Sequence, residues 1–250
     1  SIGDIRANGA LEVTKNTSVE FASHFTGTHF TSGNLSKAPN YLKLSQFDGE
    51  VKDGTSCRVK SEMFKSARDV EISFNLEFEG REDTGKQDTL VVFPVRMNSK
   101  NNGRGYLIVV KYIPTTKRFS VSVWKDAKGI ESHYDRDYGT KLFESEETPF
   151  LDKNKKITLK IYNDAQIRPC FEFLYDGKSM MLGKPGVESS LNTVVKDTTS
   201  SAYVNDGELY IDLSISSAEQ SVTLRNMNIK TENPNQSIFI RTLLDDRAED

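Results

Sequence analysis

Residues 69–79 alternate between polar and apolar side chains at every position. The apolar phase consists of Val70, Ile72, Phe74, Leu76 and Phe78, and the polar phase consists of Asp69, Glu71, Ser73, Asn75, Glu77 and Glu79. Successive side chains of a β-strand point to opposite faces, so this pattern predicts a strand that is buried on one side. We expect the apolar phase to face the core and the polar phase to face solvent or a ligand groove.

The same period of two recurs along the chain. In residues 207–216, the expected inner phase is Leu209, Ile211, Leu213 and Ile215, and the outer phase is Tyr210, Asp212, Ser214 and Ser216. β-Branched and aromatic residues predict further strands at 41–45, 56–64, 89–97, 105–113, 118–125, 156–163, 169–176, 221–230 and 237–243. Turns are predicted at Asp53-Gly54, Pro114–Thr116, Asp176-Gly177 and Asp206-Gly207.

These strands indicate an all-β protein. The segments 15–40, 126–155 and 178–206 are expected to be long loops, and no stretch sustains a helical period. About eleven strands without a repeat or a Pro/Gly-rich linker predict one antiparallel two-sheet β-sandwich over residues 1–244. A hydrophobic content of 36% suits this class, because half of each strand faces water. The charged residues 245–250 are expected to form a tail or linker stub.

Charge and hydropathy exclude two classes of partner. The net charge of −3 lacks the basic excess of a nucleic-acid-binding protein, so we expect no nucleic-acid partner. No apolar run is long enough to cross a bilayer, so we expect no membrane insertion. The two cysteines, Cys57 and Cys170, are too few for a disulfide framework or a cysteine-built metal site. They form either one bridge or two buried thiols, and the sequence leaves both alternatives open.

The order of the strands resembles that of concanavalin A-like lectin/glucanase domains. The resemblance starts with the strands at 41–45, 56–64 and 69–76. It continues in the hairpin 157–178, which ends in Phe-Leu-Tyr-Asp-Gly-Lys, and in the closing strand 222–230. The resemblance implies a jelly roll of two curved sheets, a concave groove that binds a glycan or polysaccharide, and a secreted or cell-surface location. It implies no cofactor beyond a structural calcium ion, for which no ligand set is readable.

Hydrolases of this superfamily need two carboxylates close together on one strand face. The laminarinase-like motif Glu-x-Asp-x-x-Glu is absent, and the nearest substitutes are the pairs Asp69/Glu71 and Glu77/Glu79. Both pairs fall near the ends of the predicted strand, where charged residues commonly protect an edge. We therefore expect no hydrolysis of neutral glucans.

Polysaccharide lyases of the same fold need a cation or amide to neutralise a uronate and a side chain to act as base. The alginate-lyase relatives carry Arg-x-Glu-x-Arg, Gln-Ile-His and Tyr-Phe-Lys-x-Gly, and none of these motifs is intact here. The alternative interpretation is ordinary surface residues. The candidates for a lyase site are Arg58, Lys60, Arg96, Tyr106, Tyr112 and His133.

Trp124 is the strongest candidate for binding a ligand. In strand 118–125 it shares the polar phase with Arg118, Ser120 and Ser122, and an exposed indole can stack on a sugar ring. The alternative is that loop 126–140 folds back and covers it. That loop contributes the other binding candidates, which are His133, Tyr134, Arg136 and Tyr138.

Together these patterns favour a carbohydrate-binding, lectin-like or adhesin domain that recognises a glycan in a concave sheet groove. A polysaccharide lyase acting on an acidic glycan is the first alternative, and a laminin G-like protein-binding domain is the second. Whether the chain is an enzyme stays open at this point, with a lyase favoured over a hydrolase.

Overall fold

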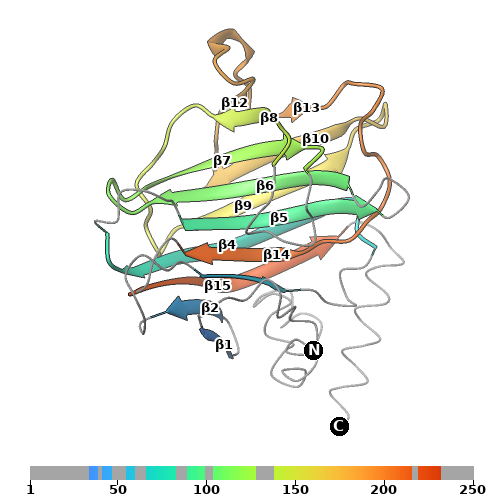
Figure 1. Ribbon diagram of the computed structural model, residues 1–250. Coiled ribbons are helices and arrows are strands. Elements are labelled where there is room, and N and C mark those ends of the chain that lie inside the picture. The colour runs from blue at the N-terminus through green and yellow to red at the C-terminus, as the bar shows by residue number, and fades with distance from the viewer. Residues whose placement is uncertain are drawn as a thin grey trace.

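The computed structural model describes residues 34–38, 41–46, 55–59, 66–82, 89–98, 104–127, 138–215 and 219–231. These residues form two antiparallel β-sheets that pack face to face (Figure 1). In the view of Figure 1 the seven-stranded sheet lies in front and the eight-stranded sheet lies behind it. The predicted all-β, two-sheet sandwich is confirmed.

The eight-stranded sheet joins the two ends of the described chain, because β15 lies between β2 and β4. Its order is β1 (Asn34–Ala38), β2 (Tyr41–Gln46), β15 (Gln220–Thr231), β4 (Val70–Gly80), β9 (Lys156–Asn163), β10 (Pro169–Tyr175) and β11 (Lys178–Ser179), and β13 (Val195–Lys196) also pairs with β10.

The seven-stranded sheet contains a meander of four consecutive strands, β5 to β8. Its order is β12 (Leu182–Gly183), β8 (Thr140–Ser145), β7 (Arg118–Lys125), β6 (Arg104–Ile113), β5 (Thr89–Asn98), β14 (Ile211–Ile215) and β3 (Thr55–Val59). The chain passes from one sheet to the other at eight connections, which are β2–β3, β3–β4, β4–β5, β8–β9, β11–β12, β12–β13, β13–β14 and β14–β15. This is the jelly-roll arrangement that the resemblance to concanavalin A-like domains implies.

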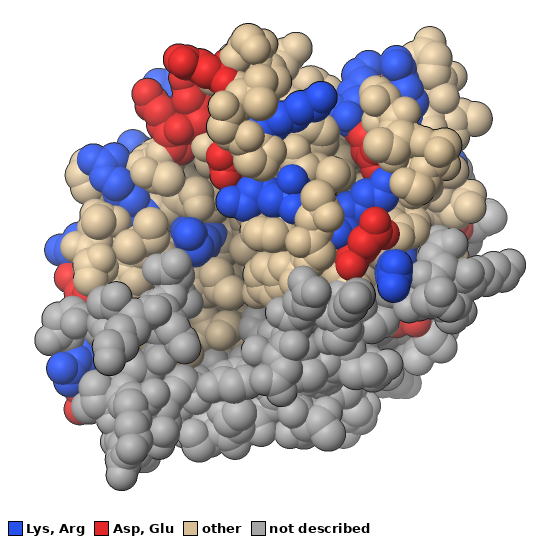
Figure 2. Space-filling view, turned by 45° about the horizontal axis from the view of Figure 1, so that its top comes forward, with Lys and Arg blue, Asp and Glu red and all other residues tan. Residues whose placement is uncertain are grey.

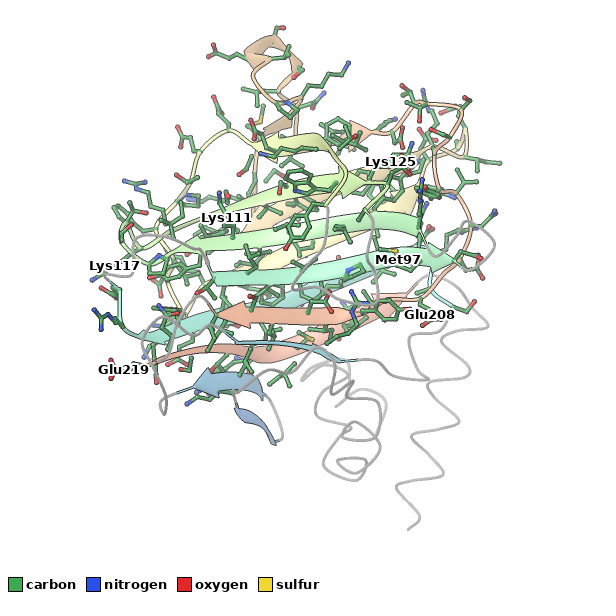
Figure 3. All side chains as sticks on the ribbon, in the orientation of Figure 1. Met97, Lys111, Lys117, Lys125, Glu208 and Glu219 are labelled. Carbon is green, nitrogen blue, oxygen red and sulfur yellow. The ribbon has the colours of Figure 1, made fainter. Side chains whose placement is uncertain are left out.

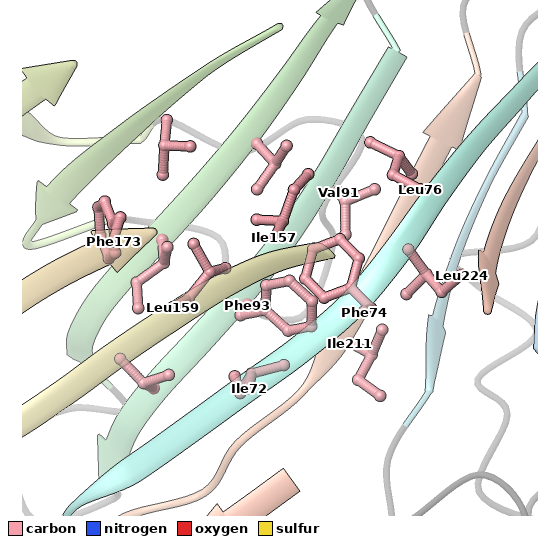
Figure 4. Close-up of a cluster of buried hydrophobic side chains, with 14 of the residues drawn as sticks. Ile72, Phe74, Leu76, Val91, Phe93, Ile157, Leu159, Phe173, Ile211 and Leu224 are labelled. Carbon is pink, nitrogen blue, oxygen red and sulfur yellow. The ribbon is translucent and has the colours of Figure 1, made fainter. Parts of the chain in front are cut away.

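The core lies between the sheets and is built from the predicted inner phases (Figure 4). Val70, Ile72, Phe74 and Leu76 of β4 are all buried, and Phe74 packs against Phe93 of β5 with ring centroids 5.5 Å apart. Phe78, the last residue of the predicted phase, is only partly buried and packs against the edge of the core. The inner phase predicted for residues 207–216, from Leu209 to Ile215, is buried in the same cluster. Alternation in the sequence therefore identified the core face of both sheets correctly.

The predicted outer phases are less exposed than expected. On β4, Ser73 is buried between its cross-strand partners Thr158 and Asn228. Asn75 is also buried, and its amide donates a hydrogen bond to the carbonyl of Lys153 at 3.1 Å. Cross-strand neighbours and local polar contacts thus cover positions that alternation alone assigns to solvent.

All three predicted loops contain strands. β1 lies within 15–40, β8 within 126–155, and β11, β12, β13 and the 3-10 turn η4 (Glu188–Ser190) within 178–206. Most of these strands are only two residues long, too short to display a period of two. The predicted strand at 56–64 is described as far as Val59, and 237–243 lies outside the described residues, as does the tail 245–250.

The predicted turns at Pro114–Thr116 and at Asp176-Gly177 are confirmed, and both Asp176 and Gly177 have positive φ. The turn predicted at Asp206-Gly207 is wrong, because Gly207 instead pairs with Ala67. A Cβ on Gly207 would lie 2.4 Å from the carbonyl carbon of Arg96, so glycine is needed here for close approach of two backbones. Asp53-Gly54 lies outside the described residues.

Cys170 is a buried free thiol, so it forms no bridge to Cys57, whose side chain lies outside the described part of the structure. Burial raises the pKa of the Cys170 thiol. Within the described ranges, no helix is long and apolar enough to cross a membrane.

Candidate functional site

The outer face of the seven-stranded sheet carries a second apolar cluster. Its buried members are Val92, Met97, Leu107, Val109, Ala127 and Tyr210, and the partly buried Leu90, Trp124 and Tyr138 pack against them. Tyr210 and Asp212 lie in the outer phase of residues 207–216, as predicted, but both side chains are buried. The face that the sequence assigned to solvent therefore has a packed apolar floor.

Trp124 lies on this face, in the polar phase of β7, as predicted. Phe119, Val121 and Val123 of the opposite phase are buried in the main core. The Trp124 Nε1–H donates a hydrogen bond to Ser122 Oγ at 2.8 Å, which fixes the orientation of the indole. Lys141 Nζ lies 5.2 Å from the centre of the indole ring, within the range of a cation–π contact.

Tyr138 covers part of Trp124. The two rings meet edge to face with centroids 5.7 Å apart. Burial, reinforced by the nearby negative charge of Asp212, raises the pKa of Tyr138 and keeps its hydroxyl protonated. The predicted covering of Trp124 thus occurs through Tyr138, yet the indole remains partly exposed. The other predicted loop residues, His133, Tyr134 and Arg136, lie outside the described residues.

A buried ion pair lies beneath this face. The Arg58 guanidinium donates from Nε and Nη2 to the two carboxylate oxygens of Asp212 at 2.8 and 2.9 Å. The guanidinium also lies 4.7 Å from the centre of the Tyr210 ring. Arg58 and Asp212 are 1% and 0% exposed, so Arg58 is engaged and closed to a ligand. Sequence reasoning missed the pair because its members are far apart in the chain and adjacent only through the β3–β14 pairing.

The described lyase candidates do not come together. Arg58 is on the outer side of the seven-stranded sheet, whereas Tyr106 and Tyr112 point into the main core. Arg96 is buried at one end of the sandwich, where it joins the two sheets. Lys60 and His133 lie outside the described residues. The residues that the structure describes therefore give no support to the lyase alternative.

Arg96 is a structural clamp. It donates hydrogen bonds to the carbonyls of Arg68 and Tyr203 and to Asn163 Oδ1, and its Nη2 lies 3.3 Å from Asp69 Oδ1. Burial lowers the pKa of Arg96 to about 10, and the carboxylate of Asp69 partly offsets that effect. These carbonyl, amide and carboxylate groups satisfy the guanidinium, which offsets the cost of burying a charged arginine inside the sandwich.

A second polar network fixes the segment that follows β13. Lys125 Nζ donates to Asp197 Oδ2 at 2.8 Å, to Thr199 Oγ1 at 2.9 Å and to Ser201 Oγ at 3.0 Å. The Tyr106 hydroxyl donates to the same Asp197 oxygen at 2.6 Å. Although burial opposes ionisation, these hydrogen bonds lower the pKa of Asp197. Tyr106 is thus a buried donor with a raised pKa, chiefly because of desolvation.

Three of the four carboxylates considered for hydrolysis, Asp69, Glu71 and Glu77, are engaged by cations. Glu77 pairs with Arg225 at 2.7 Å, and that hydrogen bond is the main cause of its lowered pKa. Glu71 lies 3.5 Å from Lys160 and 3.6 Å from Lys230. Both glutamates belong to the eight-stranded sheet, away from Trp124.

A hollow of about 270 Å³ lies beside β8 and is lined in part by Glu144, Glu146, Gly183, Lys184 and Glu188. In the space-filling view, acidic side chains gather toward the upper left, while Lys and Arg side chains spread across the middle (Figure 2). Among the described residues, no three His, Cys, Asp or Glu side chains cluster as metal ligands.

No protein-family model and no curated protein matches the sequence. Among solved structures, a legume lectin-like domain from Entamoeba histolytica is 11% identical, with 84% of this chain and 91% of that chain covered and a TM-score of 0.48. The Emp46p carbohydrate recognition domain, potassium-bound, is 12% identical, with coverages of 83% and 88% and a TM-score of 0.49. The VIP36 exoplasmic/lumenal domain bound to Ca2+ and mannose is 14% identical, with both coverages 84% and a TM-score of 0.47. No site residue of this chain follows from these likenesses.

Proposed function

We propose that this chain is a non-catalytic, lectin-like carbohydrate-binding domain whose ligand stacks on Trp124. The observation that carries the proposal is a partly exposed indole in the polar phase of β7. Large aromatic side chains are usually buried, and one presented beside polar groups suits the mixed apolar and polar surface of a sugar.

The surroundings of Trp124 support this role. Its hydrogen bond to Ser122 and its edge-to-face contact with Tyr138 hold the ring in one orientation before a ligand arrives. Preorganisation reduces the ordering cost of binding. Lys141 is 34% exposed and can donate hydrogen bonds to sugar oxygens next to the stacked ring.

The non-catalytic part of the proposal rests on the engaged state of the candidate catalytic groups. Arg58 and Arg96 are buried in ion pairs, and Tyr106 is hydrogen-bonded to Asp197. We also propose that the domain is secreted or lies at the cell surface, a location that fits a glycan ligand.

The test is the substitution Trp124→Ala in the full chain. A glycan array first identifies a bound glycan, and calorimetric titration then compares the variants with the wild type. Loss of a stacked, partly desolvated aromatic contact should weaken binding by about 1–3 kcal/mol. Trp124→Phe, which keeps an aromatic ring, should retain part of the affinity.

Ile167→Ala is the matched control, because Ile167 is a large, 63% exposed apolar residue in the β9–β10 turn of the other sheet. It should leave affinity unchanged. Thermal unfolding verifies that each variant folds. Unchanged glycan affinity in folded Trp124→Ala, or failure of the wild type to bind any glycan, would remove the proposal.

A further inference from the structure

A second aromatic ring lies on the same face as Trp124, at the opposite end of β7. Phe150 pairs with Arg118 through a short bridge, in which Phe119 N–H donates to the carbonyl of Pro149 at 3.0 Å and Leu151 N–H donates to that of Lys117 at 2.9 Å. Directly paired residues of antiparallel strands share a face. Phe150 therefore lies on the side of Arg118, and it is 61% exposed.

The two aromatic rings have similar surroundings. The Arg118 guanidinium lies 3.9 Å from the centre of the Phe150 ring, and the Lys141 ammonium lies 5.2 Å from that of Trp124. Each end of the β7 outer face thus combines a ring, which can stack on the C–H face of a sugar, with a cation beside it.

Between these ends, the outer phase of β7 consists of small polar side chains. Ser120 and Ser122 separate Arg118 from Trp124, and both serines are partly exposed. Six residues of extended chain span about 20 Å. Figure 3 labels Lys117 and Lys125 at the two ends of this strand, with Lys111 of β6 between them. The rings are therefore too far apart for one monosaccharide to contact both.

Positive charge predominates along this row. Lys111 is the cross-strand partner of Ser120, so it adds a third cation to Arg118 and Lys141. On β8, Glu144 is the partner of Ser122, and it pairs with Lys141 at 3.0 Å. Two residues beyond Glu144, the exposed Glu146 adds a second carboxylate beside β8. Three cations and two carboxylates leave a formal surplus of one positive charge along the strand, which favours an anionic ligand.

We propose that this face binds an extended anionic oligosaccharide, carrying uronate carboxylates or sulfates, laid along β7 from Trp124 to Phe150. This inference rests on the proposed function, because it takes the Trp124 site as one end of the binding surface. It adds the second end, the direction of the chain and the charge of the ligand.

The experiment measures affinity against chain length. Calorimetry uses oligomannuronates and heparin-derived oligosaccharides of two, four and six sugar units, with neutral cello-oligosaccharides of the same lengths for comparison. The wild type should bind the anionic hexamers more tightly than the dimers, and more tightly than the neutral hexamers. The two anionic series distinguish carboxylate from sulfate recognition.

Phe150→Ala should lower hexamer affinity about tenfold and leave dimer affinity unchanged, because only a long ligand reaches both rings. Trp124→Ala should weaken binding at every length. Phe150→Tyr should restore the length dependence, and Ile167→Ala should match the wild type. Arg118→Gln should weaken the binding of anionic hexamers more than that of neutral hexamers. Far-UV circular dichroism and thermal unfolding check the fold of each variant.

The outcomes separate the two proposals. If Trp124→Ala weakens binding but Phe150→Ala matches the wild type at every length, the extended site is wrong and the Trp124 site stands. If neutral hexamers bind as tightly as anionic ones, the charge selection is wrong. If neither anionic series binds while the glycan array identifies a neutral ligand whose binding depends on Trp124, the extended anionic site is wrong and the Trp124 site stands. If no glycan binds, both proposals fall.

Discussion

The position of Phe74 in an alternating strand determines its burial and its contribution to stability. It is fully buried between the sheets and packs against Phe93. Phe74→Ala should lower the free energy of unfolding by about 3–5 kcal/mol, because it removes buried apolar surface and leaves a cavity. Urea denaturation monitored by circular dichroism measures this loss.

The control for Phe74 is Thr158→Ala, in the outer phase of the neighbouring β9, where the side chain is partly exposed. It should change the unfolding free energy by less than about 0.5 kcal/mol. A loss below about 1 kcal/mol for Phe74→Ala would mean that the phase of β4 is misassigned.

At the residue scale, alternation predicted which phase of a strand faces the core, but not what covers the other phase. The phase of Trp124 follows from the local sequence, whereas its contact with Tyr138 depends on the return of a long connection. The pairing of Arg58 with Asp212 depends on two strands that meet only in the folded sheet. Single-strand patterns carry no information about such long-range partners.

At the scale of elements, the segment 195–203 is held to the sandwich by a buried charge pair. Lys125 and Asp197 have side chains that are 5% and 1% exposed. Hydrogen bonds from Lys125, Tyr106 and Thr199 stabilise the ionised Asp197 against the cost of burial and lower its pKa. An acid whose pKa is lowered by folding stabilises the protein above its unfolded pKa, and this contribution disappears as the pH falls through the folded pKa.

We therefore predict that wild-type stability falls below about pH 4, in part through protonation of Asp197. Asp197→Asn should lose about 3–5 kcal/mol at pH 7, because Lys125 is left buried without its counter-charge. Its stability should also decline less steeply in acid than that of the wild type. Urea unfolding from pH 7 to pH 3 measures both effects.

The double variant Lys125→Met/Asp197→Asn is the control, since it removes both charges. It should recover part of the stability that Asp197→Asn loses at pH 7. Equal acid dependence in the wild type and Asp197→Asn would show that other carboxylates, such as Glu77, dominate the response.

Elements with a long alternating or β-branched run were predictable, and short ones were not. The strands β4, β6 and β7 are eight residues or longer and follow the predicted ranges closely. β8 was missed because its pattern is interrupted by a register shift opposite Val123 and Trp124. A bulge breaks the period of two, which is the signal on which the prediction depends.

At the scale of the whole molecule, one core cluster contains residues of both sheets. We predict that the described sandwich unfolds in a single cooperative transition. Trp124 is the only tryptophan and reports on the outer face, whereas far-UV circular dichroism reports on all strands. The two urea transitions should coincide. A fluorescence midpoint at lower urea would identify the outer cluster as a separately unfolding unit.

The fold class was predictable from sequence because the long strands carry either an alternating or a β-branched apolar run, and few architectures accommodate so many strands without helices. The candidate site was predictable only at Trp124. Phe150 has no alternating context, and its place on the outer face of the sheet follows from the bridge to Arg118. Sites assembled from separate segments require the pairing of strands, which sequence patterns do not specify.

The two-residue strands β11 and β12 have a consequence for self-association. β11 is the edge strand of the eight-stranded sheet opposite β1, and β12 is the edge strand of the seven-stranded sheet opposite β3. An exposed border strand offers unpaired backbone groups that can template another chain, and a long flat one promotes aggregation. Strands this short offer few such groups, and Lys141 and Glu144 add charge to the adjacent β8. These two edges are therefore built to resist edge-to-edge stacking of one molecule on another.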